Sequence, residues 1–240
     1  KENKYDDDIF FQKYSQMSCS QQGLAGAGEW ETLRKLLPDF KDKRVLDLGC
    51  GYGWHCIYAM EHGASSVVGV DISHKMLEVA KEKTHFPQVE YKCCAIEDVE
   101  FPEESFDVIL SSLAFHYVAD YEILVKKIYR ILKSGGKLVF TVEHPVFTAY
   151  GTQDWYYNEK GEILHFPVDN YYYEGKRTAV FLGEKVTKYH RTLTTYLNTL
   201  LSNGFIINHI VEPQPPEYMM DIPGMRDEMR RPMMLIVSAN

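Results

Sequence analysis

The sequence predicts an α/β fold, a doubly wound and mostly parallel sheet of seven strands that carries an aromatic-rich cap as an insertion. Three observations predict it. Short apolar runs alternate with amphipathic helical segments through residues 44–142, which is the pattern of a parallel sheet covered on both faces. A glycine-rich turn joins the first apolar run to the first helix of this alternation. Aromatic residues then crowd residues 143–185, before a helix and two more apolar runs complete the sequence.

The elements of the first part are expected in a regular order. Residues 1–40 are polar with interspersed aromatic side chains, and should form a helical lid whose leucine-rich end is stopped by Pro38. Strands are expected over the apolar runs at 43–49, 65–71, 88–95, 106–112 and 135–143. Helices are expected between them at 54–62, 73–84 and 121–132. Ser73 is a suitable N-cap, and Gly63 suits a left-handed cap at the end of the preceding helix.

The pattern changes after Val142. Residues 143–185 hold ten aromatic residues in 43 positions, against 13 % for the whole chain. Two hairpins are expected from this part, one turning at residues 158–161 and the other at residues 174–176. A helix over 185–204 and strands at 205–212 and 231–240 should follow. We therefore expect one domain, divided into a lid at 1–40, a core at 44–142, a cap at 143–185 and the last core elements at 186–240.

Composition narrows the expected partners. The chain has 240 residues and a net charge of −8 without a run of lysine and arginine, so nucleic acid is not expected as a partner. The five cysteines are scattered without metal-binding spacing, which predicts reduced thiols, a cytoplasmic location and no metal site. No apolar run approaches the ~20 residues of a transmembrane helix. The polar, acidic first ten residues are unlike a secretory signal.

The loops that follow the carboxyl ends of parallel strands form one ligand-binding crevice. Strand order and direction alone therefore bring together residues 49–53, Asp71, and residues 94–97, 111–117 and 143–145.

The glycine-rich turn and two carboxylates indicate which ligand this crevice takes. Glycines at positions 49, 51 and 53 let the backbone approach a ligand closely. Dinucleotide sites carry their third glycine where this chain has Trp54, which disfavours a pyrophosphate and hence a nicotinamide dehydrogenase. Asp47 suits a cationic group better than a phosphate, and Asp71 can accept both hydroxyls of a ribose. The residues thus predict a nucleoside with a positively charged tail and no phosphates.

Four segments carry a resemblance to a known family: "VLDLGCGYG", "GVDIS", "FDVILSSLAFHYV" and "LKSGGKLVF". They resemble the class I S-adenosylmethionine-dependent methyltransferases, and most closely the small-molecule, type 11-like branch. The resemblance covers residues 44–142 well and the rest only loosely. It implies a Rossmann-like sheet whose last strand is antiparallel, S-adenosylmethionine as cofactor, S-adenosylhomocysteine as product, and methyl transfer to a small-molecule acceptor by in-line displacement.

The resemblance also implies roles for single residues of the cofactor site. The expected contacts are Gly49, Cys50, Gly51 and Ser111 for the methionine moiety, Asp47 for its ammonium, Asp71 for the ribose, Ile72 for the adenine face and Tyr14 as a lid. Ala95 stands where the family usually has an aspartate that accepts a bond from the adenine amino group. That contact is left to Glu97 or a main-chain carbonyl, with the Ile96 N–H available to a ring nitrogen.

An oxygen or nitrogen acceptor that is protonated at neutral pH also needs a base. His116, His144 and Glu143, in that order, are the candidates because they follow strand ends at the crevice. The tyrosines and tryptophan of the cap can exclude water and contact the sulfonium, or instead form the face of a dimer.

Two other functions remain open at this point. A binding module would keep the same cofactor loop without turnover, because the glycines and Asp71 report binding and not catalysis. A macromolecular methyltransferase is disfavoured by the acidic charge. The motifs do not identify the acceptor, the atom that is methylated or the oligomeric state.

Overall fold

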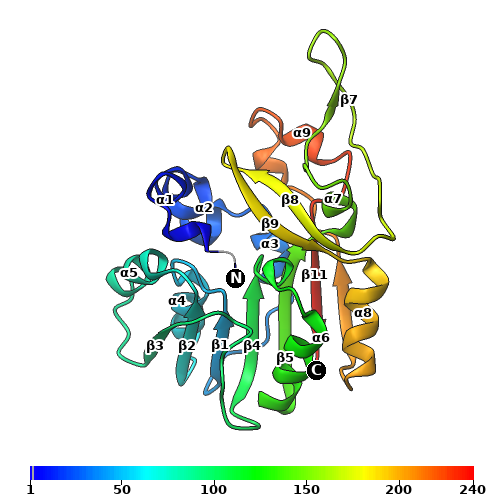
Figure 1. Ribbon diagram of the computed structural model, residues 1–240. Coiled ribbons are helices and arrows are strands. Elements are labelled where there is room, and N and C mark those ends of the chain that lie inside the picture. Colours follow the sequence, from blue (N-terminus) through cyan, green and yellow to red (C-terminus); the bar gives the residue numbers. More distant parts are fainter. Residues whose placement is uncertain (2) are drawn as a thin grey trace.

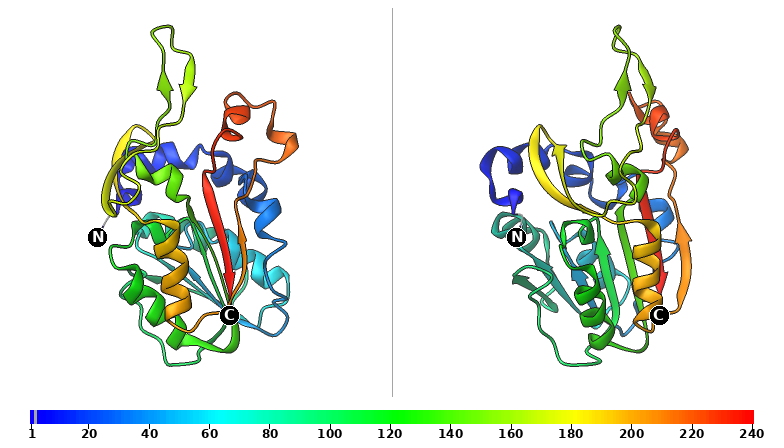
Figure 2. Two further views of the ribbon diagram at one scale, coloured as in Figure 1. Left: turned by 90° about the vertical axis from the view of Figure 1, so that its right-hand side faces the viewer. Right: turned by 45° about the vertical axis from the view of Figure 1, so that its right-hand side comes forward.

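A computed structural model describes Lys1 and residues 3–240, and its centre is one twisted sheet with helices on both faces (Figures 1 and 2). The sheet has seven strands in the order β10-β11-β5-β4-β1-β2-β3. These strands are β1 (Arg44–Leu48), β2 (Ser66–Asp71), β3 (Val89–Cys93), β4 (Phe106–Ser112), β5 (Leu132–Glu143), β10 (Ile207–Val211) and β11 (Met234–Ala239). β11 pairs antiparallel with both β5 and β10, whereas the pairs among β1 to β5 are parallel. The predicted fold class is confirmed.

Three main helices lie where the alternating pattern predicted them, and a fourth occupies the later part of the helix predicted over 185–204. They are α4 (Trp54–Glu61), α5 (His74–Lys83), α6 (Tyr121–Ile131) and α8 (Leu193–Ser202). The Ser73 side chain accepts a bond from Met76 N at 3.2 Å and caps α5, as predicted. Gly63, with φ +88°, ends the segment after α4 in the left-handed region, also as predicted.

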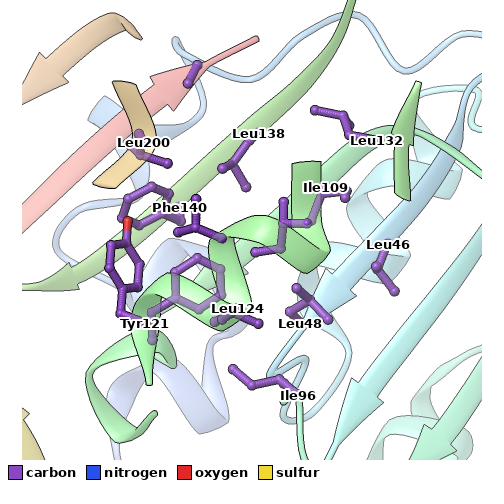
Figure 3. Close-up of a cluster of buried hydrophobic side chains, with 14 of the residues drawn as sticks. Leu46, Leu48, Ile96, Ile109, Tyr121, Leu124, Leu132, Leu138, Phe140 and Leu200 are labelled. Carbon is purple, nitrogen blue, oxygen red and sulfur yellow. The ribbon is translucent and has the colours of Figure 1, made fainter. Parts of the chain in front are cut away.

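The core consists of two apolar layers, one on each face of the sheet. Leu46 and Leu48 of β1 face the layer of α6 and α8, together with Ile109 and Phe140 (Figure 3). Val45, the residue before Leu46, faces the opposite layer with Trp30, Phe40 and Ala59. The alternation is the period of two expected of strands buried on both sides. This rigid slab fixes where the strand ends, and the loops after them, lie.

The second hairpin of the cap differs from its prediction. β8 (Gly175–Phe181) and β9 (Glu184–His190) turn at Leu182–Gly183 and not at residues 174–176. Both turn residues have positive φ, +54° and +79°, which is the type I′ geometry that suits a two-residue hairpin. The predicted helix over 185–204 is wrong for its first part, because residues 184–190 alternate between inward and outward side chains; α8 begins only at Leu193. The first hairpin, β6 (Tyr156–Tyr157) with β7 (Ile163–His165), turns where it was expected.

The remaining elements cover the carboxyl ends of the strands (Figure 1). Those that precede β1 in the chain are η1 (Lys4–Asp6), α1 (Asp8–Ser15), α2 (Ser18–Gln21), η2 (Gly23–Gly26) and α3 (Trp30–Leu33). Later in the chain they are η3 (Phe115–Tyr117), α7 (Pro145–Ala149), η4 (Glu217–Met219) and α9 (Met225–Glu228). The leucine-rich helix expected before Pro38 is present only as the short α3, followed by turns.

The N-terminal arm, residues 3–16, is attached at two places. Asp6 accepts bonds from the Ser73 hydroxyl at 2.6 Å and from Lys75 N at 3.2 Å, at the start of α5. At the other end of the arm, Lys13 donates to Leu182 O at 2.9 Å in the β8–β9 turn. The arm and the β8–β9 hairpin therefore meet above the sheet edge. Among the residues described, none of the helices is long and apolar enough to cross a bilayer.

Candidate functional site

A cavity of about 390 Å³ lies at the carboxyl edge of the sheet. The loops after β1, β2, β3 and β4 and the last residue of β5 contribute to its wall, and the N-terminal arm and the β8–β9 hairpin contribute side chains from the other side. Its volume is in the range of small-molecule sites, which is ~300–1,000 Å³. The edge is the one at which parallel α/β sheets bind ligands.

The glycine loop after β1 forms a close-fitting part of the wall. Gly49 and Gly51 have φ of +81° and +52°, in the left-handed region. A Cβ on Gly49 would lie 2.4 Å from the Cβ of Ala114, in the loop after β4. Cys50 lines the cavity between the two glycines, and its N–H donates to Val70 O at 2.9 Å. The absence of side chains thus lets the loop lie against both the cavity and β4.

Asp71 ends β2 at the cavity wall, and backbone donors fix its carboxylate. Gly51 N donates to Oδ2 at 2.9 Å, and Ser73 N donates to Oδ1 at 2.9 Å. Burial raises the pKa of Asp71, and the two backbone bonds oppose that shift. Each oxygen keeps a further lone pair, so the carboxylate can accept two more hydrogen bonds from a ligand.

The end of β3 supplies the next part of the wall. Ile72, Ala95, Ile96 and Glu97 all line the cavity, as their place after the strand ends led us to expect. Ala95 and Ile96 are buried, with apolar side chains. This side of the cavity therefore offers mostly apolar side chains next to the Asp71 carboxylate.

Two residues expected at the cofactor lie beneath the cavity wall and do not line it. Asp47 is 1 % exposed; its Oδ2 accepts a bond from the Cys56 thiol at 3.4 Å, and its Oδ1 has no partner among the described residues. Burial raises the pKa of Asp47 to about 7. Ser111 is 3 % exposed and donates to Leu48 O at 2.7 Å. In this arrangement neither side chain is placed to contact a ligand in the cavity directly.

Glu29 is a carboxylate that the sequence analysis missed. It precedes α3, is 6 % exposed and lines the cavity. Among the residues that the structure describes, no other residue bonds to its side chain; burial raises its pKa, and a bond from its own backbone N–H opposes that shift. Acidic residues are common before helices because they interact favourably with the helix dipole, so the position of Glu29 carried no separate signal of a ligand contact.

A second group of polar side chains faces the cavity beyond β4 and β5. Lys188 Nζ lies 2.5 Å from Glu143 Oε1 and 2.9 Å from Gln153 Oε1. Gln153 Nε2 donates to Glu143 Oε2 at 2.6 Å. Burial alone would raise the pKa of Glu143, but His116, Lys188 and Gln153 act against it and the pKa is lowered. Lys188 was missed because its segment was predicted to be helical.

His116 lines the cavity beside this group. Its Nδ1 accepts a bond from Glu143 N at 3.4 Å, so the neutral ring carries its proton on Nε2. Burial lowers the pKa of His116 to about 4, because the charged form would lose its hydration. Near neutral pH His116 is therefore a hydrogen-bond donor toward the cavity.

His144 does not line the cavity. It caps α7 by accepting a bond from Val146 N at 3.1 Å, and its Nε2 lies 2.9 Å from Glu212 Oε1. His190 and Arg191 also have structural partners: His190 Nδ1 lies 2.7 Å from the Thr148 hydroxyl, and Arg191 donates to Ala119 O at 3.0 Å.

Tyrosines of the N-terminal arm cover the cavity. Tyr14 lines it, and its ring packs edge-on against Tyr5 and Tyr52 at centroid distances of 5.2 and 5.8 Å. The Tyr5 hydroxyl lies 3.4 Å from that of Tyr117, in η3. The arm thus reaches across from the β2 side of the cavity to the β4 side.

The strand order, the antiparallel β11 and a glycine loop facing a carboxylate at the end of β2 define a nucleoside-binding α/β fold. A family model for a methyltransferase domain matches residues 46–140. A structure from Listeria monocytogenes, described as a "putative S-adenosylmethionine dependent methyltransferase", is 58 % identical with a TM-score of 0.87, over 90 % of this chain and 98 % of that one.

Two further proteins agree with this match. An S-adenosylmethionine-dependent methyltransferase from Mesorhizobium loti is 41 % identical with a TM-score of 0.83, over 90 % of this chain and 99 % of that one. A Haemophilus influenzae protein without a described activity is 35 % identical over 98 % of this chain and 95 % of its own length. The chain belongs to the class I S-adenosylmethionine-dependent methyltransferases, type 11 branch, and S-adenosylmethionine is its cofactor. The predicted family and cofactor are confirmed.

Proposed function

We propose that this methyltransferase transfers the methyl group to a small-molecule acceptor by in-line displacement on carbon. The observation that carries the proposal is the covered cavity itself. The same space of about 390 Å³ is bounded by Asp71 at one end and by Glu143 and Lys188 at the other. The glycine loop lies between these ends, because β1 stands between β2 and β4 in the sheet.

The residues of the β1, β2 and β3 ends fit the cofactor. When bound there, S-adenosylmethionine supplies an electrophilic methyl group on a good leaving group. Asp71 would accept the ribose hydroxyls, and the close approach at Gly49 and Gly51 would admit the methionine moiety. Ile72 and Ile96 would pack on the adenine, with Glu97 or a main-chain carbonyl near its amino group.

Glu29 replaces Asp47 in our assignment of the ammonium contact. A carboxylate that is buried at the cavity wall, with no ion pair among the described residues, stabilises a cation more directly than one beneath the wall. Asp47 and Ser111 would then support the loop from below, since they bond to Cys56 and to Leu48. Tyr14 would close over the site and exclude water.

Glu143 is the base that the geometry supports best. It lines the cavity with a charged carboxylate, whereas His116 presents a proton on Nε2 and His144 lies outside the cavity. For an acceptor that carries a proton, Glu143 would take that proton as the new bond forms. The remaining contribution to catalysis is alignment, because the nucleophile, the methyl carbon and the sulfur must lie in one line.

A small acceptor is favoured over a macromolecule by what covers the site. The N-terminal arm and the β8–β9 hairpin meet above the cavity, where Phe10 and Phe181 pack at a centroid distance of 5.8 Å. The net charge of −8 also opposes a nucleic acid. Such a covered site admits a molecule that the lid can enclose.

Transfer of isotopic label tests this proposal. The protein is incubated with S-adenosylmethionine labelled in its methyl group and with a cell extract separated into low-mass and macromolecular fractions. We expect enzyme-dependent label in a low-mass product. Label confined to protein or nucleic acid, or cofactor bound without any transfer, would contradict it. Heat-inactivated protein is the control.

A further inference from the structure

Lys188, Glu143 and Gln153 form a closed triangle of hydrogen bonds, which we call the acceptor triangle. Its three contacts are the 2.5 Å ion pair and the 2.9 and 2.6 Å bonds described above. The members come from three separate segments, β9, the end of β5 and the loop after α7. Only Lys188 and Glu143 line the cavity, and their side chains are 3 % and 12 % exposed.

Stability alone does not account for this arrangement. A buried ion pair loses the hydration of both charges, and well-packed apolar side chains are often as stable. Elsewhere in this hairpin Ala179 and Val186 pack on Phe10 in a small apolar cluster, and the buried His190 bonds to the neutral Thr148 hydroxyl. A full ion pair buried at a cavity wall indicates that the cavity's occupant needs these charges.

The triangle leaves both a donor and an acceptor available to the cavity. The Lys188 ammonium has three N–H groups, and Glu143 and Gln153 take two of them. Glu143 receives one bond on each oxygen and keeps further lone pairs. The donor and the acceptor are thus adjacent, separated by the 2.5 Å of the ion pair itself.

A hydroxyl group matches this pair better than other acceptor groups. It can accept from Lys188 while it donates to Glu143. A carboxylate would be repelled by the negative charge of Glu143, and an ammonium would be repelled by the positive charge of Lys188. The rings of Tyr117 and Phe181 lie 5.9 and 5.4 Å from Lys188 Nζ and give the site flat apolar walls. His116 Nε2–H adds a second donor on the same side.

We propose that the acceptor triangle binds the reacting hydroxyl of a planar enol or phenol, which the enzyme methylates on oxygen. This inference rests on the proposed function. The O–H proton goes to Glu143, the oxygen forms a bond to the methyl carbon, and the carbon–sulfur bond breaks with its electron pair on sulfur. The sulfonium becomes a neutral thioether, and Glu143 then releases the proton to water. The Lys188 ammonium stabilises the negative charge that develops on oxygen.

Three probes of one shape test which group is recognised: 4-nitrophenol, 4-nitroaniline and 4-nitrobenzoate. Binding of each is measured in the presence of S-adenosylhomocysteine, so that no turnover occurs. We expect nitrophenol to bind about tenfold more tightly than the other two, and its apparent pKa, read from the phenolate absorbance, to fall by about one unit on binding. Equal binding of the three, a preference for another probe, or no binding of any would overturn the proposal.

Variants connect this preference to the triangle. In Lys188→Met and Glu143→Gln the preference for nitrophenol should disappear, and in Lys188→Met the pKa shift as well. Lys185→Met, an exposed position on the same strand, should retain both. If a single variant fails to fold, the double variant Lys188→Met/Glu143→Met removes both charges together and replaces them with apolar side chains. A triangle variant that keeps the preference would contradict the assignment.

The failure of this inference differs from failure of the proposed function. If the wild-type enzyme labels a low-mass product whose new methyl group lies on nitrogen, sulfur or carbon, the small-molecule function holds and the hydroxyl assignment is wrong. If label enters only macromolecules, the proposed function itself is wrong. Mass spectrometry of the labelled product separates the two results.

Discussion

At the carboxyl edge of the sheet, the alternation of side chains along each strand decides which residues face the cavity. Asp47 lies between Leu46 and Leu48, whose side chains enter the layer of α6 and α8. Its own side chain must therefore point to the opposite layer, where it meets Cys56 of α4. Asp71 instead ends its strand, and the chain turns there toward the cavity. Two aspartates near the same loop thus have different surroundings.

This difference predicts a pH dependence for Asp47. Because burial raises its pKa to about 7, the folded protein binds a proton at Asp47 that the unfolded chain loses near pH 4. Its contribution to stability is present at low pH and is lost as the pH rises from about 4 to about 7. In Asp47→Asn this loss, on the order of 4 kcal/mol, should be absent. Urea unfolding of both proteins at several pH values measures it, and parallel curves would contradict the shift.

Gly49 provides a second prediction at this scale. In Gly49→Ala the new Cβ would meet the Cβ of Ala114 at 2.4 Å, at a φ of +81°. We expect a loss of about 2–4 kcal/mol in the free energy of unfolding, from backbone strain and crowding together.

A matched control separates those two causes. Gly135 has a similar φ of +71° but nothing within 4 Å of its Cβ position. Gly135→Ala should therefore cost only the strain, about 1 kcal/mol. Equal losses in the two variants, measured by urea unfolding, would show that the contact with Ala114 does not matter.

At the scale of elements, the lid is made of two parts that are distant in sequence. The N-terminal arm and the β8–β9 hairpin share one small apolar cluster, with Phe10, Ala179 and Val186 buried in it. This cluster is separate from both layers of the sheet core. We therefore expect the arm to detach while the sheet stays folded, as an exchange of cofactor and product requires.

Phe10→Ala should loosen this lid. Phe10 is fully buried, so its truncation removes most of the contact between arm and hairpin. We expect S-adenosylhomocysteine to dissociate about tenfold faster, with little change in the unfolding of the sheet core. The fluorescence of Trp30 and Trp54, which both line the cavity, reports the release in a stopped-flow experiment. Ile9→Ala, at a residue 59 % exposed on the same helix, is the control, and equal release rates would count against the lid.

The elements that the sequence predicted well are those whose burial has a simple period. The strands β1, β2, β4 and β5 are apolar runs between two helical layers, and α6 has an apolar stripe with five buried residues on one side. β9 could not be recognised in this way. Its inward residues are Val186, Lys188 and His190, so the side chains that alternate inward are mostly polar. Their partners come from the cap and β5, and no local pattern encodes those contacts.

At the scale of the whole molecule, the sheet order explains why one cavity contains both the proposed cofactor site and the proposed acceptor site. β1 lies between β2, which carries Asp71, and the pair β4 and β5 on its other side, of which β5 carries Glu143. The topology and the family were predictable from the alternation and the glycine loop. The positions of Glu29 and Lys188 were not, because each reaches the cavity only after the lid has packed on the sheet.

Calorimetric titration with S-adenosylhomocysteine tests the central claim, that this cavity holds the cofactor through Asp71, most directly. Asp71→Asn keeps the size of the side chain and removes the charge that would accept the ribose hydroxyls. We expect its affinity to fall by about 10- to 100-fold relative to the wild type. Asp107→Asn, at a carboxylate near the start of β4 that bonds to Arg44 N and Lys133, should bind like the wild type. Equal affinity in the wild type and Asp71→Asn would contradict the account.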